Sequence, residues 1–69
     1  MKAEELERIR DQLGLTQEGM ADLLQVDYVG YKRYATGTRP VPRYVARSAT
    51  VLKFVHESGL LPRLQKHLL

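Results

Sequence analysis

Two short helical patterns, separated by a break of only three residues, constrain this chain more than any other feature of its sequence. The first pattern begins at Thr16, whose hydroxyl can cap a helix, and the break covers residues 25–27. Asp27 then caps the second pattern, and Gly37 stops it. Helices joined by so tight a turn cannot lie antiparallel, so they must cross steeply. Residues 16–37 are therefore expected to present their second helix to something outside the domain.

The distribution of charge indicates what that second helix faces. Residues 1–27 contain three basic and seven acidic residues, whereas residues 28–53 contain six basic residues and no acidic one. The basic stretch begins where the second helix begins, which favours a surface that faces a polyanion over a run of solvated charges. A steep helix-turn-helix pair places its second helix in the major groove of DNA. Double-stranded DNA is therefore the expected partner.

Length and composition limit the remaining classes. At 69 residues the chain is expected to be a single domain, 1–69, with a small core. It has no cysteine, which excludes a disulfide scaffold or a thiolate metal site and fits the cytoplasm. No apolar run approaches the ~18 residues of a membrane span, and residues 1–10 are too charged for a signal peptide. We therefore expect a cytoplasmic domain that makes no contact with a membrane.

Three further helices are predicted around the central pair. Residues 3–13 form an amphipathic pattern that Gly14 ends. A fourth helix begins near Pro42 or Arg43 and runs to about Ser58. Its apolar face contains Val45, Ala46, Ala49, Leu52 and Val55. A last short helix follows, so the predicted fold class is all-α with five helices.

The central pair itself makes three local predictions. Gln25 stands where such turns often place a left-handed glycine, at a cost of about 1 kcal/mol if that backbone conformation is kept. Val26 is the expected buried residue of the turn. In the second helix, spacing of three and four turns one face inward: Tyr31, Tyr34 and Ala35. The outward face contains Tyr28, Val29, Lys32, Arg33 and Thr36.

The C-terminal segment, about residues 60–69, is unusually rich in leucine. It contains five leucines within residues 60–69, more than a small monomer easily covers. We therefore expect part of this surface to pair two copies of the chain through Leu60, Leu61, Leu64 and Leu68. The alternative, in which this helix only closes the core, remains open.

No catalytic or metal-binding arrangement is evident in the sequence. His56 and His67 stand on different predicted helices, and a zinc site needs three or four converging ligands. No glycine-rich phosphate loop and no Ser/His/Asp arrangement occurs. We expect a protein that is not an enzyme and that has no catalytic residue, no metal, no cofactor and no small-molecule effector.

Residues 5–58 resemble the lambda-repressor-like, XRE-type helix-turn-helix family. The residues that match its usual pattern are Thr16, Gln17, Glu18, Ala21, Leu23, Leu24, Val26 and Gly37. Met20, Asp27, Tyr31 and Tyr34 stand for the leucine, serine, isoleucine and tryptophan that are usual there. The resemblance implies a five-helix domain that binds specific DNA sequences. The segment 31–42, Tyr-x-x-Tyr-Ala-x-Gly-x-Arg-Pro-Val-Pro, is similar to small phage-borne repressors, including anti-CRISPR-associated autorepressors, which implies repression of its own operon.

One departure from the family pattern affects the predicted site. Ala35 replaces a common glutamate, so the family's ion pair to a first-helix arginine is absent and Arg10 is expected to be free for a phosphate. The predicted base contacts are Tyr28, Val29, Lys32 and Arg33. The predicted contacts to the DNA backbone are Gln17, Thr36, Arg39, Arg43 and Arg10.

We expect a homodimeric repressor on an inverted-repeat operator, with recognition helices about 34 Å apart. The main alternative is an antitoxin-like module whose leucine-rich C-terminus holds a protein partner. A transcriptional activator would differ in using an acidic patch (Glu4, Glu5, Glu7, Asp11) to contact polymerase.

Overall fold

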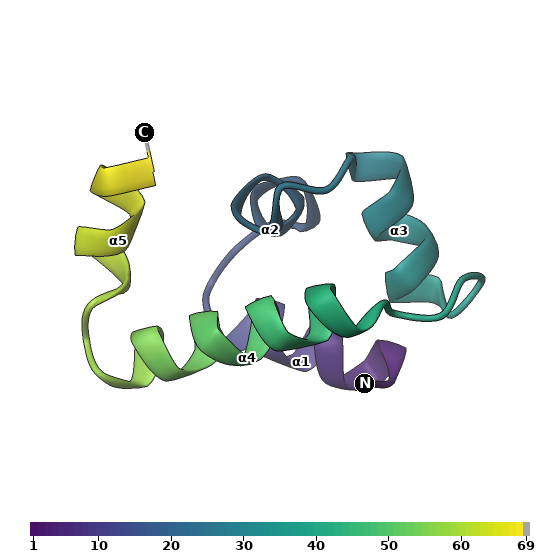
Figure 1. Ribbon diagram of the computed structural model, residues 1–69, viewed down its shortest axis with the longest axis horizontal. Coiled ribbons are helices and arrows are strands. Elements are labelled where there is room, and N and C mark those ends of the chain that lie inside the picture. Colours follow the sequence, from purple (N-terminus) through teal and green to yellow (C-terminus); the bar gives the residue numbers. More distant parts are fainter. Residues whose placement is uncertain (69) are drawn as a thin grey trace.

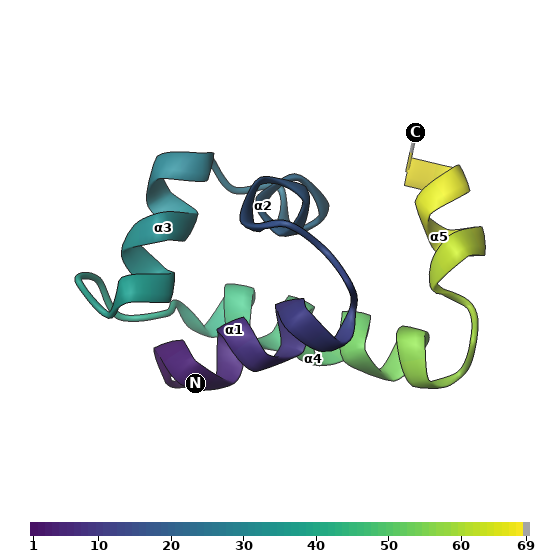
Figure 2. The same ribbon diagram turned by 180° about the vertical axis from the view of Figure 1, so that it is seen from behind.

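The computed structural model describes residues 1–68 and contains five helices in two layers. Their bounds are α1 Ala3–Gln12, α2 Gln17–Leu24, α3 Tyr28–Thr36, α4 Arg43–Glu57 and α5 Leu61–Leu68. Figures 1 and 2 show α1 and α4 side by side along one edge, with α2 and α3 on the other side. The predicted all-α, five-helix fold is confirmed. Leu69, the last residue of the predicted C-terminal segment, lies outside the described residues.

The helix ends follow from local hydrogen bonding, as the sequence predicts. The Thr16 hydroxyl accepts a hydrogen bond from the Gly19 N–H at 3.0 Å and caps α2. The Asp27 carboxylate accepts the N–H groups of Val29 and Gly30 at 3.3 and 3.2 Å and caps α3. These caps satisfy backbone donors that a helix start leaves without a partner, and they fix where α2 and α3 begin.

The turn between α2 and α3 contains the one non-glycine residue with positive φ among the described residues. Gln25 adopts φ 56° and ψ 41°, which is the left-handed conformation predicted for it. Val26 follows and donates its N–H to the Ala21 carbonyl at 3.0 Å. Its side chain is partly buried and packs against the core, so the residue expected to be buried in the turn does face the core.

One hydrophobic core joins the helices. Its largest fully buried side chains are Tyr31, Leu6, Met20 and Val45, which come from four different helices. Tyr34 is also buried and Ala35 is partly buried, so the inward face predicted for α3 is confirmed. Val45, Ala49 and Leu52 of α4 are buried, as their helical spacing predicts.

The C-terminal leucines divide between the core and the surface. Leu61 is only 5% exposed and belongs to the core, and Leu64 packs against that core. The expectation that these two residues lie on an outward surface is therefore wrong, because α5 turns back after Gly59 and covers the core with them. Leu60 and Leu68 are exposed, as expected.

Candidate functional site

The outward side of α3 is a continuous exposed surface. All five residues predicted to lie there are exposed: Tyr28, Val29, Lys32, Arg33 and Thr36. They fall on one side of the helix because 3.6 residues complete a turn. The opposite side of α3 is held in the core by Tyr31 and Tyr34. The helix is therefore anchored on one side and open on the other.

Two of these side chains are arranged by contact with each other. The Lys32 ammonium lies 4.5 Å from the centroid of the Tyr28 ring, within the range of a cation–π interaction. The Thr36 hydroxyl donates to the Lys32 carbonyl oxygen at 2.9 Å and lies 2.9 Å from the Thr38 hydroxyl. Arg33 is exposed, and its side chain makes no hydrogen bond or ion pair within residues 1–68.

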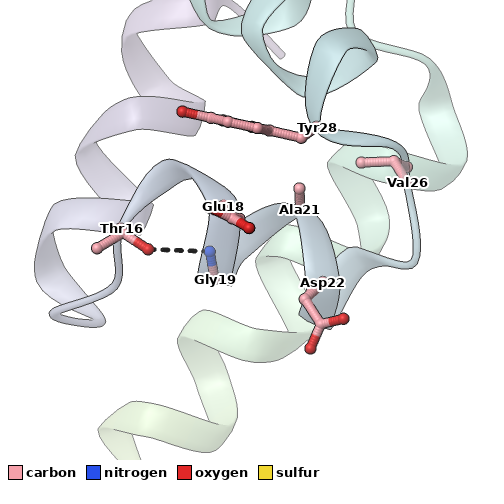
Figure 3. Close-up of a pocket in the computed structure, with 7 residues that line it drawn as sticks. All are labelled: Thr16, Glu18, Gly19, Ala21, Asp22, Val26 and Tyr28. Carbon is pink, nitrogen blue, oxygen red and sulfur yellow. Dashed lines mark hydrogen bonds between the residues drawn. The ribbon is translucent and has the colours of Figure 1, made fainter.

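An open cleft borders this surface between the beginnings of α2 and α3. Figure 3 shows Tyr28 of α3 on one side of it and Thr16 and Gly19 of α2 on the other. The cleft has a volume of about 510 Å³, and Glu18 and Asp22 line it. Their negative charge disfavours a phosphate in the cleft. The cleft therefore limits the basic surface on the α2 side, a boundary that sequence reasoning did not identify.

A polar cluster around Glu7 holds α1, α2 and α3 together. The Tyr31 hydroxyl donates to Glu7 Oε2 at 2.6 Å, and Gln17 Nε2 donates to Glu7 Oε1 at 2.9 Å. Arg10 Nε donates to Glu7 Oε2 at 3.0 Å, and its Nη1 donates to the Leu15 carbonyl oxygen at 2.6 Å. This Glu7 cluster positions the inward side of α3 relative to the start of α2.

The cluster also sets the ionisation of its members. Burial alone would raise the pKa of Glu7, but three hydrogen bonds and the charge of Arg10 outweigh burial, and the pKa lies below its ordinary value. Burial, with the hydrogen bond to Glu7 and its negative charge, raises the pKa of the Tyr31 hydroxyl above its ordinary range. Tyr31 therefore remains a donor and Glu7 remains an acceptor over the physiological pH range.

Two sequence-based expectations are corrected by this cluster. Arg10 is not free, because it pairs with Glu7, one turn earlier in α1. Glu7 thus takes the place of the glutamate that α3 lacks. Glu7 is likewise not part of a free acidic patch, because its carboxylate is occupied by three donors. Gln17 uses one amide hydrogen on Glu7, which leaves the second for another acceptor. The spacing of three between Glu7 and Arg10 is a local signal for their ion pair, whereas no local pattern indicates the contact between Glu7 and Tyr31, which lie 24 residues apart.

The predicted cations outside α3 lie at its C-terminal end. Arg39 is exposed in the loop after α3, and its N–H donates to the Arg33 carbonyl oxygen at 3.1 Å. Arg43 is exposed at the first position of α4. This hydrogen bond ties the loop to the end of α3, so the structure brings Arg39 next to the base-contact candidates.

The outer side of α4 is apolar, and sequence reasoning missed it. Tyr44, Val51 and Phe54 are 63%, 53% and 70% exposed. Val51 and Phe54 follow Tyr44 by seven and ten residues, which places all three on one helix face, opposite the buried Val45 and Ala49. The spacing of these three residues could have been found in the sequence, but only the inward face of this helix was assigned from it.

Within residues 1–68 no group of three His, Cys, Asp or Glu side chains converges as a metal site. Over the same residues, no helix has the length and apolar character needed to cross a membrane.

Comparison with known proteins identifies one family. A family model described as a helix-turn-helix domain matches residues 3–58, which covers α1 to α4. No curated protein and no solved structure matches the chain.

Proposed function

The chain belongs to the helix-turn-helix domain family, whose members bind DNA, and from that premise we propose that it is a sequence-specific transcriptional repressor that acts as a homodimer. The observation that carries the proposal is the outward side of α3, a basic and exposed surface whose opposite side is anchored in the core. A helix held in this way can enter a major groove without rearrangement of the domain. Such helix-turn-helix domains are in general not enzymes.

Base recognition is assigned to the outward side of α3. Arg33 and Lys32 can reach the O6 and N7 acceptors of guanine, and Arg33 can do so with two hydrogen bonds. Tyr28 and Val29 offer apolar contact to thymine methyl groups. Because the Tyr28 ring already lies beneath the Lys32 ammonium, less side-chain freedom is lost when the two residues meet a base pair.

Contacts to the DNA backbone are assigned to groups that flank α3. Gln17 stands at the first position of α2 and does not line the acidic cleft, so its remaining amide hydrogen can hold a phosphate there. Arg39 and Arg43 supply charge at the other end of α3, and Thr36 supplies a hydroxyl. Arg10 is left out of this assignment, because its guanidinium already binds Glu7 and the Leu15 carbonyl oxygen.

Repression in this proposal is steric. Two copies on an inverted repeat would cover a promoter and exclude polymerase, and protein concentration would control occupancy. The resemblance of residues 31–42 to small phage-borne repressors makes the promoter of its own operon the first one to test. Repression of that promoter, with an anti-CRISPR gene downstream, would support the narrower resemblance.

The test is selection of binding sites from a random duplex DNA library at ~150 mM salt, where non-specific charge binding is weak. Recovery of an inverted repeat with half-site centres about 10 base pairs apart would support the proposal. Recovery of no motif would contradict it. In that case the antitoxin-like alternative, with the exposed Leu60 and Leu68 contacting a protein partner, would become the better hypothesis.

A further inference from the structure

The outer side of α4 carries an apolar seam with the spacing of a coiled coil. Its members are Tyr44, Arg47, Val51, Phe54 and Ser58, which are separated alternately by three and four residues. All five are exposed, and the core lies on the opposite side of the helix. Three large apolar side chains on one exposed helix face form a patch that requires an explanation.

We infer that this seam is the homodimer interface, in which α4 of one copy packs antiparallel against α4 of a second copy. The inference rests on the proposed function, because it names the partner that a dimeric repressor needs. It replaces α5 as the expected pairing element, since Leu61 and Leu64 are used within the monomer.

The seam is complementary to itself in one antiparallel register. With the twofold axis near Ala49, Tyr44 of one copy meets Phe54 of the other, and two aromatic pairs form. Val51 meets the methylene stem of Arg47, whose guanidinium extends to the solvent at the edge. These contacts cover each large apolar side chain of the seam with an apolar partner.

Charge selects the same register. Arg43 and Glu57 lie on the same flank of the seam, seven residues on either side of Thr50. In the antiparallel pair, Arg43 of each copy therefore lies beside Glu57 of the other. Glu57 is the one acidic residue in the segment 28–69, and a parallel pair would leave it without this partner.

The same register also relates the two α3 helices. Packed helices lie 8–10 Å apart, so each α4 axis is about 4–5 Å from the twofold axis. Figure 1 shows α3 at the N-terminal end of α4 and α5 at its other end. A twofold axis near Ala49, in the middle of α4, therefore lies closer to α3 than an axis at the outer end of α5 does.

Pairing through the C-terminal helix would place the two α3 helices further apart. Figures 1 and 2 place α3 and α5 at opposite ends of the longest dimension of the molecule, which measures 33 Å. Pairing through the outer end of α5 would therefore separate the two α3 helices by well over one turn of DNA. The α4 seam gives the shorter of the two separations.

The area predicts a weak dimer. The exposed parts of Tyr44, Val51 and Phe54 amount to roughly 350 Å² per copy, since a whole aromatic side chain buries about 150–250 Å². With the flanking charged side chains, the pair buries on the order of 1,000 Å² in total, the lower end for a specific interface. We therefore expect dissociation in the micromolar range, with DNA strengthening the pair by holding both copies.

The chain's lack of cysteine makes a clean test possible. Ser48 is exposed beside the proposed twofold axis, so the Ser48→Cys variant should be linked into dimers by a short bis-maleimide at tens of micromolar protein. The matched control, Lys66→Cys on the exposed side of α5, should give only background linking. Adding Phe54→Glu to Ser48→Cys should reduce linking at least about tenfold, because it places a charge in the seam. Circular dichroism would verify that each variant is folded.

A charge exchange tests the register. Arg43→Glu and Glu57→Arg should each weaken the dimer in sedimentation without DNA, and the double variant should restore it. Linking of Ser48→Cys no greater than that of Lys66→Cys would overturn the inference, as would failure of the charge exchange to restore pairing. If Ser48→Cys links but site selection yields no motif, the interface stands and the repressor proposal fails. If site selection instead yields a single half-site motif and Ser48→Cys does not link, specific DNA binding stands and the α4 interface fails.

Discussion

Tyr28 and Tyr31 lie three residues apart in α3 and belong to opposite regions of the molecule. Tyr31 is fully buried, and its hydroxyl donates to Glu7 of α1. Tyr28 is exposed, and its ring lies beneath the Lys32 ammonium. The same type of residue therefore stabilises the fold on the inner side of α3 and offers a contact surface on its outer side.

Leu61 and Phe54 repeat the comparison with apolar side chains. Leu61 is 5% exposed within the core, whereas Phe54 is 70% exposed on the outer side of α4. Residue type alone would have assigned both to the core or both to an interface. The difference teaches that the neighbouring helix, and not hydrophobicity, decides whether an apolar residue closes the monomer or remains for a partner. Substitutions on the two sides should accordingly change different measured quantities.

The largest effect is expected from Leu61→Ala on the inner side. Removal of a buried leucine side chain should lower the free energy of unfolding by about 2–4 kcal/mol, a large fraction of the stability of a domain this small. Leu68→Ala, at the exposed end of the same helix, should change it by less than about 0.5 kcal/mol. Urea unfolding followed by circular dichroism measures both values. Equal losses of stability for the two variants would mean that α5 does not have one buried and one exposed side.

Arg33→Ala on the outer side should leave stability unchanged and alter base preference. Loss of a guanine contact should cost about 1–3 kcal/mol at one base position of the selected site. Arg63→Ala, which removes the same charge from exposed α5, should leave that preference intact. Fluorescence anisotropy with the selected duplex and its single-base variants would compare them. An unchanged preferred site for Arg33→Ala would exclude Arg33 from base recognition.

The predictions that succeeded depend on local physics. The caps at Thr16 and Asp27 involve residues two or three apart, and the two faces of α3 follow from the helical period. Sequence therefore located the helix-turn-helix and the exposed cations on it. The left-handed Gln25 was also recognisable, because the tight turn demanded that conformation.

The predictions that failed concern the partner that each side chain finds. Arg10 was expected to be free because its usual partner is missing from α3, yet Glu7 in its own helix takes that place. The leucines of α5 could not be divided between core and surface until the direction of α5 was known. A period of 3.6 shows which residues share a face, but it does not show which neighbour covers that face.

A smaller effect on the inner side is expected from Glu7→Gln. The variant loses charge-assisted hydrogen bonds to Arg10 and Tyr31, which should lower stability by about 1–2 kcal/mol at pH 7. The folded state holds the pKa of Glu7 below its ordinary value. Its carboxylate therefore stabilises the fold at pH values above the unfolded pKa, and this contribution is lost as pH falls through the folded pKa. The difference between variant and parent should therefore narrow by pH 3.

Glu4→Gln, which changes an exposed carboxylate of the same helix, is the control and should show a smaller pH-dependent difference. Urea unfolding at pH 7 and pH 3 measures both variants. A difference for Glu7→Gln that stayed constant with pH would contradict the role of the ionised carboxylate.

The smallest effect is expected from Gln25→Gly, at the junction between the two regions. Gln25 has φ 56°, and glycine adopts that conformation without the steric cost of a side chain, about 1 kcal/mol. Glycine also gives the unfolded chain more freedom, so the net gain in stability should be below about 1 kcal/mol. Gln65→Gly within α5 should lower stability by about 1 kcal/mol, because glycine is unfavourable inside a helix. Changes in the free energy of unfolding of opposite sign for the two variants, measured by urea unfolding, would show that the turn stores strain. The turn also sets the angle at which α3 leaves α2. DNA affinity measured on Gln25→Gly would therefore show whether the strained geometry is the one that binds.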